Sequence, residues 1–229
     1  MRDALFLSVL GGLLSLSVVQ TAEAQEGVEV YLGAVAGVAV LSADATSGAT
    51  ANGDGFTFSH YAAKNGPALN LFAGAHLTDY VTVQANYRWN RNDFRSASAS
   101  ATSAVTVFDD DLGRSTQHAV VGDVLLYFRE RSSRFRPYLS AGVGAVWVTS
   151  DPDQDNGASG SEGSSVSFAD TIPVLRVAVG IDVEVGPRWL VRYSFSEGIS
   201  PNPFSERLSP PGESGLMNFQ NLVGLIYRF

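Results

Sequence analysis

The feature that most constrains this chain is a strict alternation of apolar and polar residues. Between Val81 and Asn90 the odd positions hold Val, Val, Ala, Tyr and Trp, whereas the even positions hold Thr, Gln, Asn, Arg and Asn. Because successive side chains of a β-strand point to opposite faces, this period of two predicts a strand with one apolar and one polar face. The same alternation recurs over residues 172–185, 189–196 and 218–229.

Eight segments can be interpreted as strands of this kind. They are Val28–Leu41, Ala68–Leu77, Val81–Asn90, Gln117–Phe128, Pro137–Val148, Ile172–Val185, Trp189–Ser196 and Asn218–Phe229. Their lengths bracket the roughly 9–11 residues with which a tilted strand crosses a bilayer. Short turns near residues 77–80, 129–136 and 186–188 alternate with long, low-complexity loops, an arrangement typical of outer-membrane barrels. The pattern predicts an all-β fold, an eight-stranded antiparallel up-and-down transmembrane β-barrel.

The N-terminal segment has the composition of an export signal. Arg2 precedes an apolar run from Ala4 to Val19, and Ala22 and Ala24 supply the small residues that signal peptidase requires. The apolar run is shorter than the about 20 residues of a spanning helix. We therefore expect residues 1–24 to be a cleaved signal peptide and residues 25–229 to form the barrel domain.

Charge and cysteine content exclude several classes of function. The net charge is −8, which argues against a nucleic-acid partner because such a partner requires a basic surface. The chain has no cysteine, so disulfides, thiol catalysis and thiolate metal sites are all excluded. We expect no cofactor.

The polar faces of the predicted strands carry a balanced set of charges. If the apolar faces contact lipid, the charges that point into the lumen are Glu29, Arg88, Asp123, Arg176, Asp182, Glu184, Arg192 and Arg228. A soluble sandwich or lipocalin-like barrel also alternates, but its core would not hold so many ions, since each is costly to bury unless paired. An eight-stranded barrel is just wide enough to be filled by side chains. The pattern predicts a side-chain plug; the alternative is a wet lumen whose charges lack fixed partners.

Two ion pairs follow from this arrangement. Folding the hairpin about the turn at 186–188 sets Asp182 opposite Arg192, both pointing inward. Glu29 and Arg228 lie at the same end of the first and last strands, which must meet when the barrel closes. Arginine suits such pairs because its planar fork binds a carboxylate through two hydrogen bonds.

Aromatic residues mark both ends of the apolar faces, as expected at two membrane interfaces. The predicted girdles consist of Tyr80, Phe128, Trp189, Tyr227 and Phe229 near the short turns, and of Trp89, Trp147, Phe195 and Phe219 near the long loops.

Several stretches resemble the small outer-membrane β-barrel family that includes the OmpX-, OmpA-barrel- and Opa-like proteins. They are VEVYLGAVAGVAV, HAVVGDVLLYF followed by FRPYLSAGVGAVWV, and the terminal GLIYRF. The resemblance implies a barrel with both termini in the periplasm. It also implies that Phe229 and Tyr227 form an assembly signal read by the barrel-assembly machinery. The family's roles include adhesion, stress resistance, envelope integrity and minor channel activity.

The stretch RYSFSEGISPNP resembles the strand of lipid A deacylases that carries a histidine, a serine and an asparagine. Here the histidine is lacking and Glu197 stands at the asparagine position. Ser196 therefore has no local base, and a serine hydroxyl requires one to attack an ester. The chain has three histidines, His60, His76 and His118. Each is more typical of a polar residue at the membrane interface or in the lumen than of a catalytic base. We expect no enzymatic activity.

An acidic run in the third long loop is compatible with calcium. Asp151, Asp153, Asp155 and Glu162 occupy positions 1, 3, 5 and 12 of the run, the spacing of a calcium-binding loop. The alternative is a solvated acidic loop without a bound ion.

Together these features predict a monomeric protein of the bacterial outer membrane, exported through the periplasm, with a plugged lumen. We expect it to act in envelope structure or through its surface loops, in contact with membrane lipid and lipopolysaccharide. Loops rich in Gly, Ser and Ala do not identify a surface ligand. The alternatives are a small passive channel and a lipid A deacylase-like enzyme.

Overall fold

A computed structural model describes the backbone of residues 28–42, 45–51, 55–63, 65–102, 105–152, 168–202 and 215–229. Side chains are described over 28–41, 65–93, 114–149, 169–202 and 215–229. The predicted export segment, residues 1–24, lies outside these ranges. No helix among the described residues is long and apolar enough to cross a membrane.

The described residues form strands joined by turns. In chain order the strands are β1 (Glu29–Ser42), β2 (Ala45–Ala51), β3 (Gly55–Ala63), β4 (Gly66–His76), β5 (Val81–Thr102), β6 (Val105–Tyr127), β7 (Phe135–Pro152), β8 (Phe168–Gly186), β9 (Trp189–Pro201) and β10 (Gly215–Arg228).

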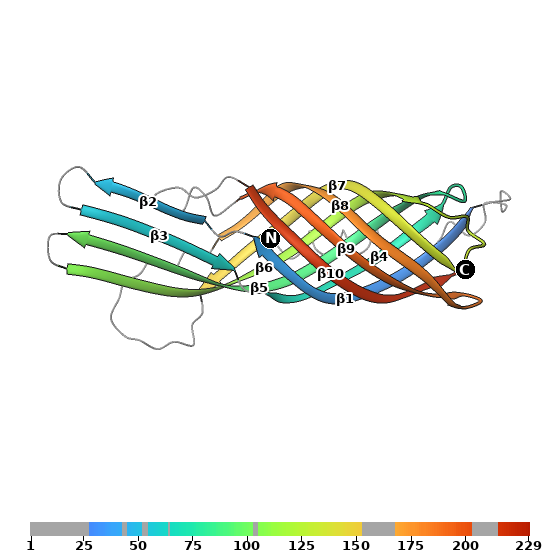
Figure 1. The fold of residues 1–229 in the computed structure, drawn as a ribbon, viewed down its shortest axis with the longest axis horizontal. Coiled ribbons are helices and arrows are strands. Elements are labelled where there is room, and N and C mark those ends of the chain that lie inside the picture. Colours follow the sequence, from blue (N-terminus) through green and yellow to red (C-terminus); the bar gives the residue numbers. More distant parts are fainter. Residues whose placement is uncertain are drawn as a thin grey trace, which may run out of the picture.

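Eight of these strands close into an antiparallel barrel, which confirms the predicted fold. Around the wall the order is β1, β4, β5, β6, β7, β8, β9 and β10, and β10 pairs again with β1. Figure 1 shows the strands slanting around the long axis, with the C-terminus at the end that carries the short turns. Closure pairs the backbone on both sides of every barrel strand, which a spanning sheet requires because lipid offers no hydrogen bonds.

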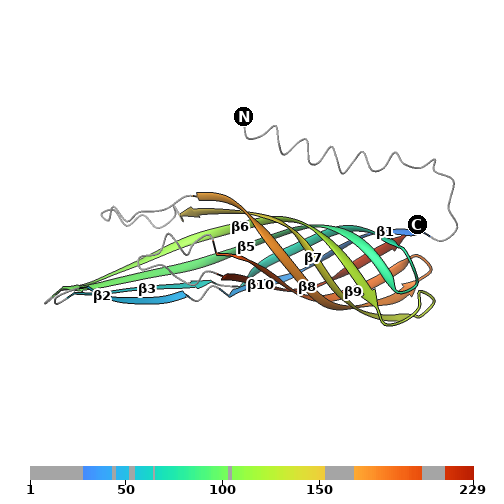
Figure 2. The ribbon, with the colours of Figure 1, turned by 90° about the horizontal axis from the view of Figure 1, so that it is seen from above.

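The first two long connections are not loops, contrary to the sequence-based expectation. Within them β2 pairs with β3, and β3 pairs with the outer part of β5, where the β5–β6 ladder continues to Thr102 and Val105. These strands project beyond the barrel at the end opposite the C-terminus (Figures 1 and 2). The predicted strand end at Asn90 is therefore too early, and the predicted strand start at Gln117 is too late, since β5 runs to Thr102 and β6 begins at Val105. Repeats of Ser, Ala and Thr show little polarity contrast between faces, so their alternation was not recognised.

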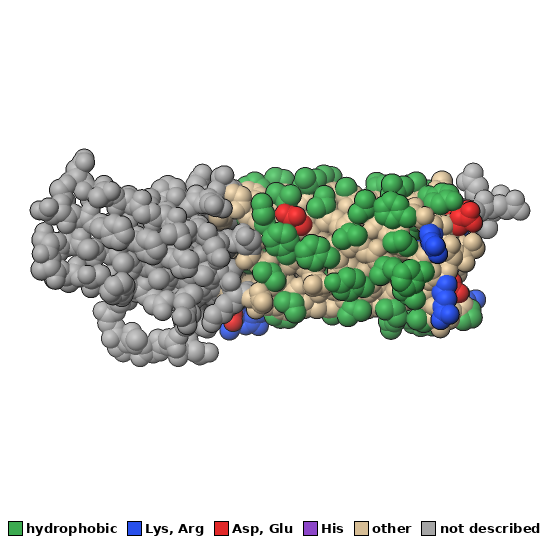
Figure 3. All heavy atoms as spheres, viewed as in Figure 1, with side chains coloured by type: hydrophobic (Ala, Val, Ile, Leu, Met, Phe, Trp, Pro, Cys, Tyr) green, Lys and Arg blue, Asp and Glu red, His purple; other side chains and the backbone are tan. Residues whose placement is uncertain are grey.

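The apolar faces point outward along the barrel wall. Val143 on β7 is 68% exposed, Val223 on β10 is 55% exposed and Leu32 on β1 is 50% exposed. In the space-filling view, hydrophobic side chains dominate the described wall, and most charged side chains lie at its two ends (Figure 3). An apolar outer surface of this kind is typical of a barrel that is surrounded by lipid.

Candidate functional site

The lumen holds two connected groups of polar side chains. We call the group nearer the short turns the turn-side tier and the group nearer the long connections the loop-side tier. The turn-side tier consists of Tyr31, Gln84, Tyr127, Asp182 and Arg192. The loop-side tier consists of Asn86, Arg88, Asp123, Arg176 and Gln220. Each of these side chains is at least nine-tenths buried.

Arg192 on β9 is the centre of the turn-side tier. The turn at 186–188 sets Asp182 on β8 opposite Arg192, which is the register expected from the sequence. Arg192 Nε donates to Asp182 Oδ1 and Arg192 Nη2 donates to Asp182 Oδ2, both at 2.7 Å. Arg192 Nη1 donates to Gln84 Oε1 at 2.7 Å. Because β5 lies four strands from β9 in either direction around the wall, this side chain reaches across the whole lumen.

Aromatic side chains enclose this guanidinium. The Tyr127 hydroxyl donates to Asp182 Oδ2 at 2.7 Å, and the Tyr31 hydroxyl donates to Gln84 Oε1 at 2.8 Å. The Arg192 guanidinium lies 4.7 Å from the ring centre of Phe72 and 4.8 Å from that of Tyr138. Contacts of a cation with aromatic faces strengthen when water is excluded. The tier is therefore a buried cross-brace whose polar atoms all have partners.

Two glycines make room for the tyrosines of this region. Gly74 is the register partner of Tyr31, and Gly180 is the register partner of Tyr138. A Cβ atom at either glycine would overlap the facing tyrosine ring. Both rings can thus lie flat against the inner wall, where a larger residue would displace them.

The loop-side tier continues the same hydrogen-bond chain. Gln84 Nε2 donates to Asn86 Oδ1 at 2.7 Å, and Asn86 Nδ2 donates to Asp123 Oδ2 at 3.0 Å. Asp123 is also the ion-pair partner of Arg176. The chain of contacts therefore runs without a break from Arg192 to Arg176.

Arg88 in this tier has a different environment. Its Nε donates to Gln220 Oε1 at 3.1 Å, and no carboxylate among the described residues pairs with it. Amide side chains lie around it, since Gln220 Nε2 and Asn218 Nδ2 both donate to Asn90 Oδ1, at 3.3 and 3.1 Å. Arg88 is thus held by neutral amides instead of an acid.

Three of the predicted lumen charges lie at the turn-side mouth of the barrel. Arg228 lies 3.5 Å from Glu29 and 2.9 Å from Glu184, measured between charged atoms. Arg131, which the sequence analysis did not single out, lies 3.7 Å from Glu29 and from Asp79. These side chains are partly exposed, so solvent weakens their attraction.

Arg136 and the lumenal tyrosines are not among the lumen residues predicted from the sequence. Arg136 is 1% exposed, its guanidinium lies 3.9 Å from the ring centre of Tyr127, and its Nη2 donates to the Asp79 carbonyl at 3.1 Å. The expected strand began at Pro137, whereas β7 begins at Phe135. Extending the alternation by two residues from Tyr138 would have placed Arg136 inside.

Apolar side chains form further buried clusters in the interior. One cluster lies on the inner faces of β6, β7, β8 and β10, and a second lies around β1, β4, β9 and β10. The first cluster comprises Ala119, Val121, Val146, Val148, Ile172, Val174 and Leu216. The charged tiers are therefore surrounded by apolar walls, which strengthens each electrostatic contact between them.

The residues of the two predicted aromatic girdles lie on the outer face. At the turn side the ring centres of Trp189 and Tyr227 are 5.0 Å apart and those of Tyr227 and Phe229 are 5.2 Å apart. Towards the long connections Phe195 stacks on Phe219 at 6.1 Å. The remaining members, which are exposed or half-exposed, are Tyr80, Trp89, Phe128 and Trp147.

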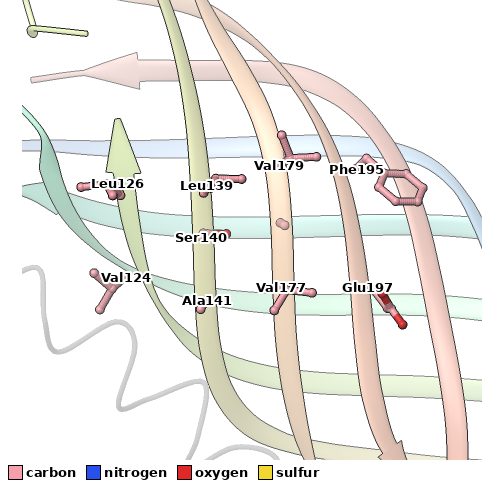
Figure 4. A pocket seen from close by; sticks show the side chains of 10 residues that line it. Val124, Leu126, Leu139, Ser140, Ala141, Val177, Val179, Phe195 and Glu197 are labelled. Atoms are coloured by element: carbon pink, nitrogen blue, oxygen red, sulfur yellow. The ribbon is translucent and has the colours of Figure 1, made fainter. Parts of the chain in front are cut away.

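A shallow groove of about 580 Å³ crosses the outer face of β6, β7, β8 and β9 (Figure 4). Apolar side chains such as Val124, Leu139 and Val177 line it, and Ala141 leaves it hollow at the centre. Glu197 closes one end. Because the groove opens outward through apolar side chains, it is a feature of the lipid-facing wall and not of the lumen.

The structure places the candidate hydrolytic residues apart from one another. Ser196 is 1% exposed and points into the lumen, and its Oγ has no hydrogen-bond partner among the described residues. His76 contacts Thr82 Oγ1 at 2.5 Å, whereas His118 contacts the Tyr87 hydroxyl at 2.7 Å. The side chain of His60 is outside the described ranges. The Ser196 hydroxyl therefore faces the lumen and not the lipid-facing wall.

The candidate calcium ligands Asp151, Asp153, Asp155 and Glu162 are all outside the ranges with described side chains. Within those ranges, no group of three or more His, Asp or Glu residues is arranged to hold a metal ion.

Comparisons with known proteins agree with the fold and the apolar wall. Solved structures that are similar include Neisserial surface protein A, with 14% identity, a TM-score of 0.53 and coverage of 89% of this chain and 100% of that one. OprG from Pseudomonas aeruginosa is similar with 15% identity, a TM-score of 0.54 and coverage of 89% and 96%. No curated protein sequence gives a match. Residues 8–229 match the family described as the outer membrane protein beta-barrel domain. The chain belongs to this family of bacterial outer-membrane barrels.

Proposed function

We propose that this barrel is a closed, non-enzymatic protein of the outer membrane that acts in envelope structure or through its surface segments. The observation that carries the proposal is the Arg192 side chain, which spans the lumen from β9 to Gln84 on β5 while Asp182 holds its other two nitrogens. A lumen crossed by paired charges and lined with apolar clusters leaves no evident path for ions.

The projecting strands support a role at the surface. β2, β3 and the outer parts of β5 and β6 form a hydrogen-bonded extension beyond the barrel. This paired extension is longer and more regular than is needed only to connect neighbouring barrel strands. We propose that it contacts lipopolysaccharide or another surface partner, while the apolar wall contacts membrane lipid.

Conductance in planar bilayers tests the closed lumen. We expect the wild-type barrel to give no current steps, because Arg192 and its partners occupy the cross-section. The double variant Asp182→Ala/Arg192→Ala removes the brace without leaving a lone charge, and we expect it to conduct. The matched control is Tyr193→Ala, which changes an outward-facing neighbour on the same strand. Current steps in the wild type, equal to those of the double variant, would contradict a closed lumen and favour a small passive channel.

We further propose that the C-terminal strand is read during assembly. Phe229 is 64% exposed on the outer face, and its backbone nitrogen donates to the Val30 carbonyl at 3.1 Å across the β1–β10 seam. Deleting Phe229 should lower the yield of heat-modifiable barrel in outer membranes more than Val223→Ala does. Val223 is a suitable control because it is an outward apolar residue of the same strand. Equal yields for the two variants would contradict a role of Phe229 in assembly and would leave only its position in the aromatic girdle.

A further inference from the structure

Three exposed arginines lie where the barrel wall ends at the short turns. Arg129 and Arg134 belong to the turn between β6 and β7, and Arg188 belongs to the turn between β8 and β9. We call these three the rim arginines. Each adjoins in sequence an exposed aromatic side chain of the outer wall, and these are Phe128, Phe135 and Trp189. Positive charge therefore lies directly beside apolar surface that faces lipid.

The charges described at this end of the barrel are not balanced. Six arginines face four acidic side chains, and they are Arg129, Arg131, Arg134, Arg136, Arg188, Arg228, Glu29, Asp79, Glu130 and Glu184. Blue side chains are visible at this end of the wall in Figure 3. The excess is positive although the whole chain has a net charge of −8.

Two other arginines already engage most of these acids. Arg131 pairs with Glu29 and Asp79. Arg228 pairs with Glu29 and Glu184. No ion pair joins a rim arginine to a carboxylate among the described residues. The positive charge of the rim arginines is thus open to a partner from outside the barrel.

Hydrogen bonds hold two of the rim arginines in place. Arg188 Nη1 donates to the Tyr227 hydroxyl at 3.0 Å, and Arg134 Nε donates to the Glu184 carbonyl at 3.2 Å. The Tyr227 ring packs between Trp189 and Phe229 on the outer face, so the Arg188 guanidinium lies at the polar tip of this aromatic cluster. Each guanidinium has five N–H donors, so one such bond leaves further donors for a ligand.

We propose that the rim arginines bind the phosphate groups of anionic phospholipids in the leaflet that surrounds the short turns. Aromatic girdles lie at the level of the lipid headgroups, so cations beside a girdle meet the phosphates there. A guanidinium binds phosphate through paired, charge-assisted hydrogen bonds. The proposal requires only that the apolar wall is surrounded by lipid. It depends neither on the closed lumen nor on the role proposed for the surface segments.

Tryptophan fluorescence in phospholipid vesicles tests the proposal. The chain has three tryptophans, so the variant Trp89→Phe/Trp147→Phe leaves Trp189 as the only emitter. Brominated phosphatidylglycerol and brominated phosphatidylcholine quench this emission according to how strongly each lipid binds nearby. We expect phosphatidylglycerol to be preferred at Trp189 by about fivefold at low ionic strength. Added salt should reduce this preference because it screens exposed charges.

Substitutions in the Trp189-only background assign the preference to the rim. Arg188→Gln should lower the preference, and Arg129→Gln/Arg134→Gln/Arg188→Gln should bring it close to one. Arg188→Lys keeps the charge and should retain most of the preference. Arg91→Gln removes an exposed arginine at the other end of the barrel and should leave the preference unchanged.

Three results would overturn the proposal. The first is equal quenching of Trp189 by the two lipids when the rim arginines are present. The second is a preference that survives in the triple variant. The third is an equal preference at Trp147, measured in Trp89→Phe/Trp189→Phe, because it would show a general property of the lipid mixture. Trp147 lies near the long connections and serves as the matched reporter for the opposite interface.

Discussion

The two tiers of the lumen contain similar side chains but balance their charges differently. In the turn-side tier Arg192 has a bidentate carboxylate partner and aromatic rings on its faces. In the loop-side tier Asp123 pairs with Arg176, whereas Arg88 donates to the amide oxygen of Gln220. The buried polar atoms of the first arrangement all have partners, whereas Arg88 Nη2, Arg176 Nε and Asp123 Oδ1 of the second have none among the described residues. One barrel therefore combines a fully paired brace with a second tier whose charged groups are only partly paired.

The largest expected effect comes from removing one charge of the turn-side brace. Asp182→Ala leaves Arg192 buried without its counter-charge, and the loss of one partner of a buried pair costs about 3–5 kcal/mol. Urea unfolding in micelles measures the change in free energy. Asp170→Ala, at an exposed position of the same strand, is the control. If the two variants lose equal stability, Asp182 and Arg192 are not a fixed pair.

A smaller effect is expected for Tyr127→Phe. It removes the hydroxyl that donates to Asp182 Oδ2 and leaves the ring in place, so we expect a loss of about 1–3 kcal/mol. Tyr193→Phe is the matched control, because its hydroxyl bonds Asn221 on the exposed face at 2.6 Å. An equal or larger loss for Tyr193→Phe in the same unfolding measurement would show that the lumen is not water-excluding.

The smallest effect is expected for Arg88→Gln. Arg88 has no acidic partner among the described residues, so its removal leaves no carboxylate behind, and we expect a change within about 1 kcal/mol. Arg192→Gln should be far more destabilising in the same assay because it leaves the Asp182 carboxylate buried without its counter-charge. Similar losses for the two variants would remove the distinction between the tiers.

The barrel was predictable from sequence because several of its strands, such as β5 and β9, contrast strongly between faces. The sequence places Trp89 next to Arg88, and Val191 next to Arg192. In each pair the apolar side chain is the one expected to face lipid. The register at the 186–188 turn followed from its short length, and with it the position of Asp182 opposite Arg192.

The extension and part of the interior were not predictable in the same way. Segments such as Ala45–Ala51 alternate between residues of similar polarity, so only hydrogen bonding to neighbouring strands identifies them. Tyr31 and Tyr138 point inward because Gly74 and Gly180 on adjacent strands accommodate their rings. That complementarity involves residues about 40 positions apart and appears only when the strands are paired.

Hydrogen exchange of the arginine side chains tests the closed lumen most directly. In a ¹⁵N NMR spectrum of the folded barrel transferred to D₂O, the Nε–H of Arg192 should persist, because it is buried and donates to Asp182 Oδ1 at 2.7 Å. The Nε–H of Arg188, which lies in an exposed turn, should disappear rapidly. Persistence of the Arg192 signal alone is the predicted result. Exchange of both signals at the same rate would show that water passes through the turn-side tier and would contradict a plugged barrel.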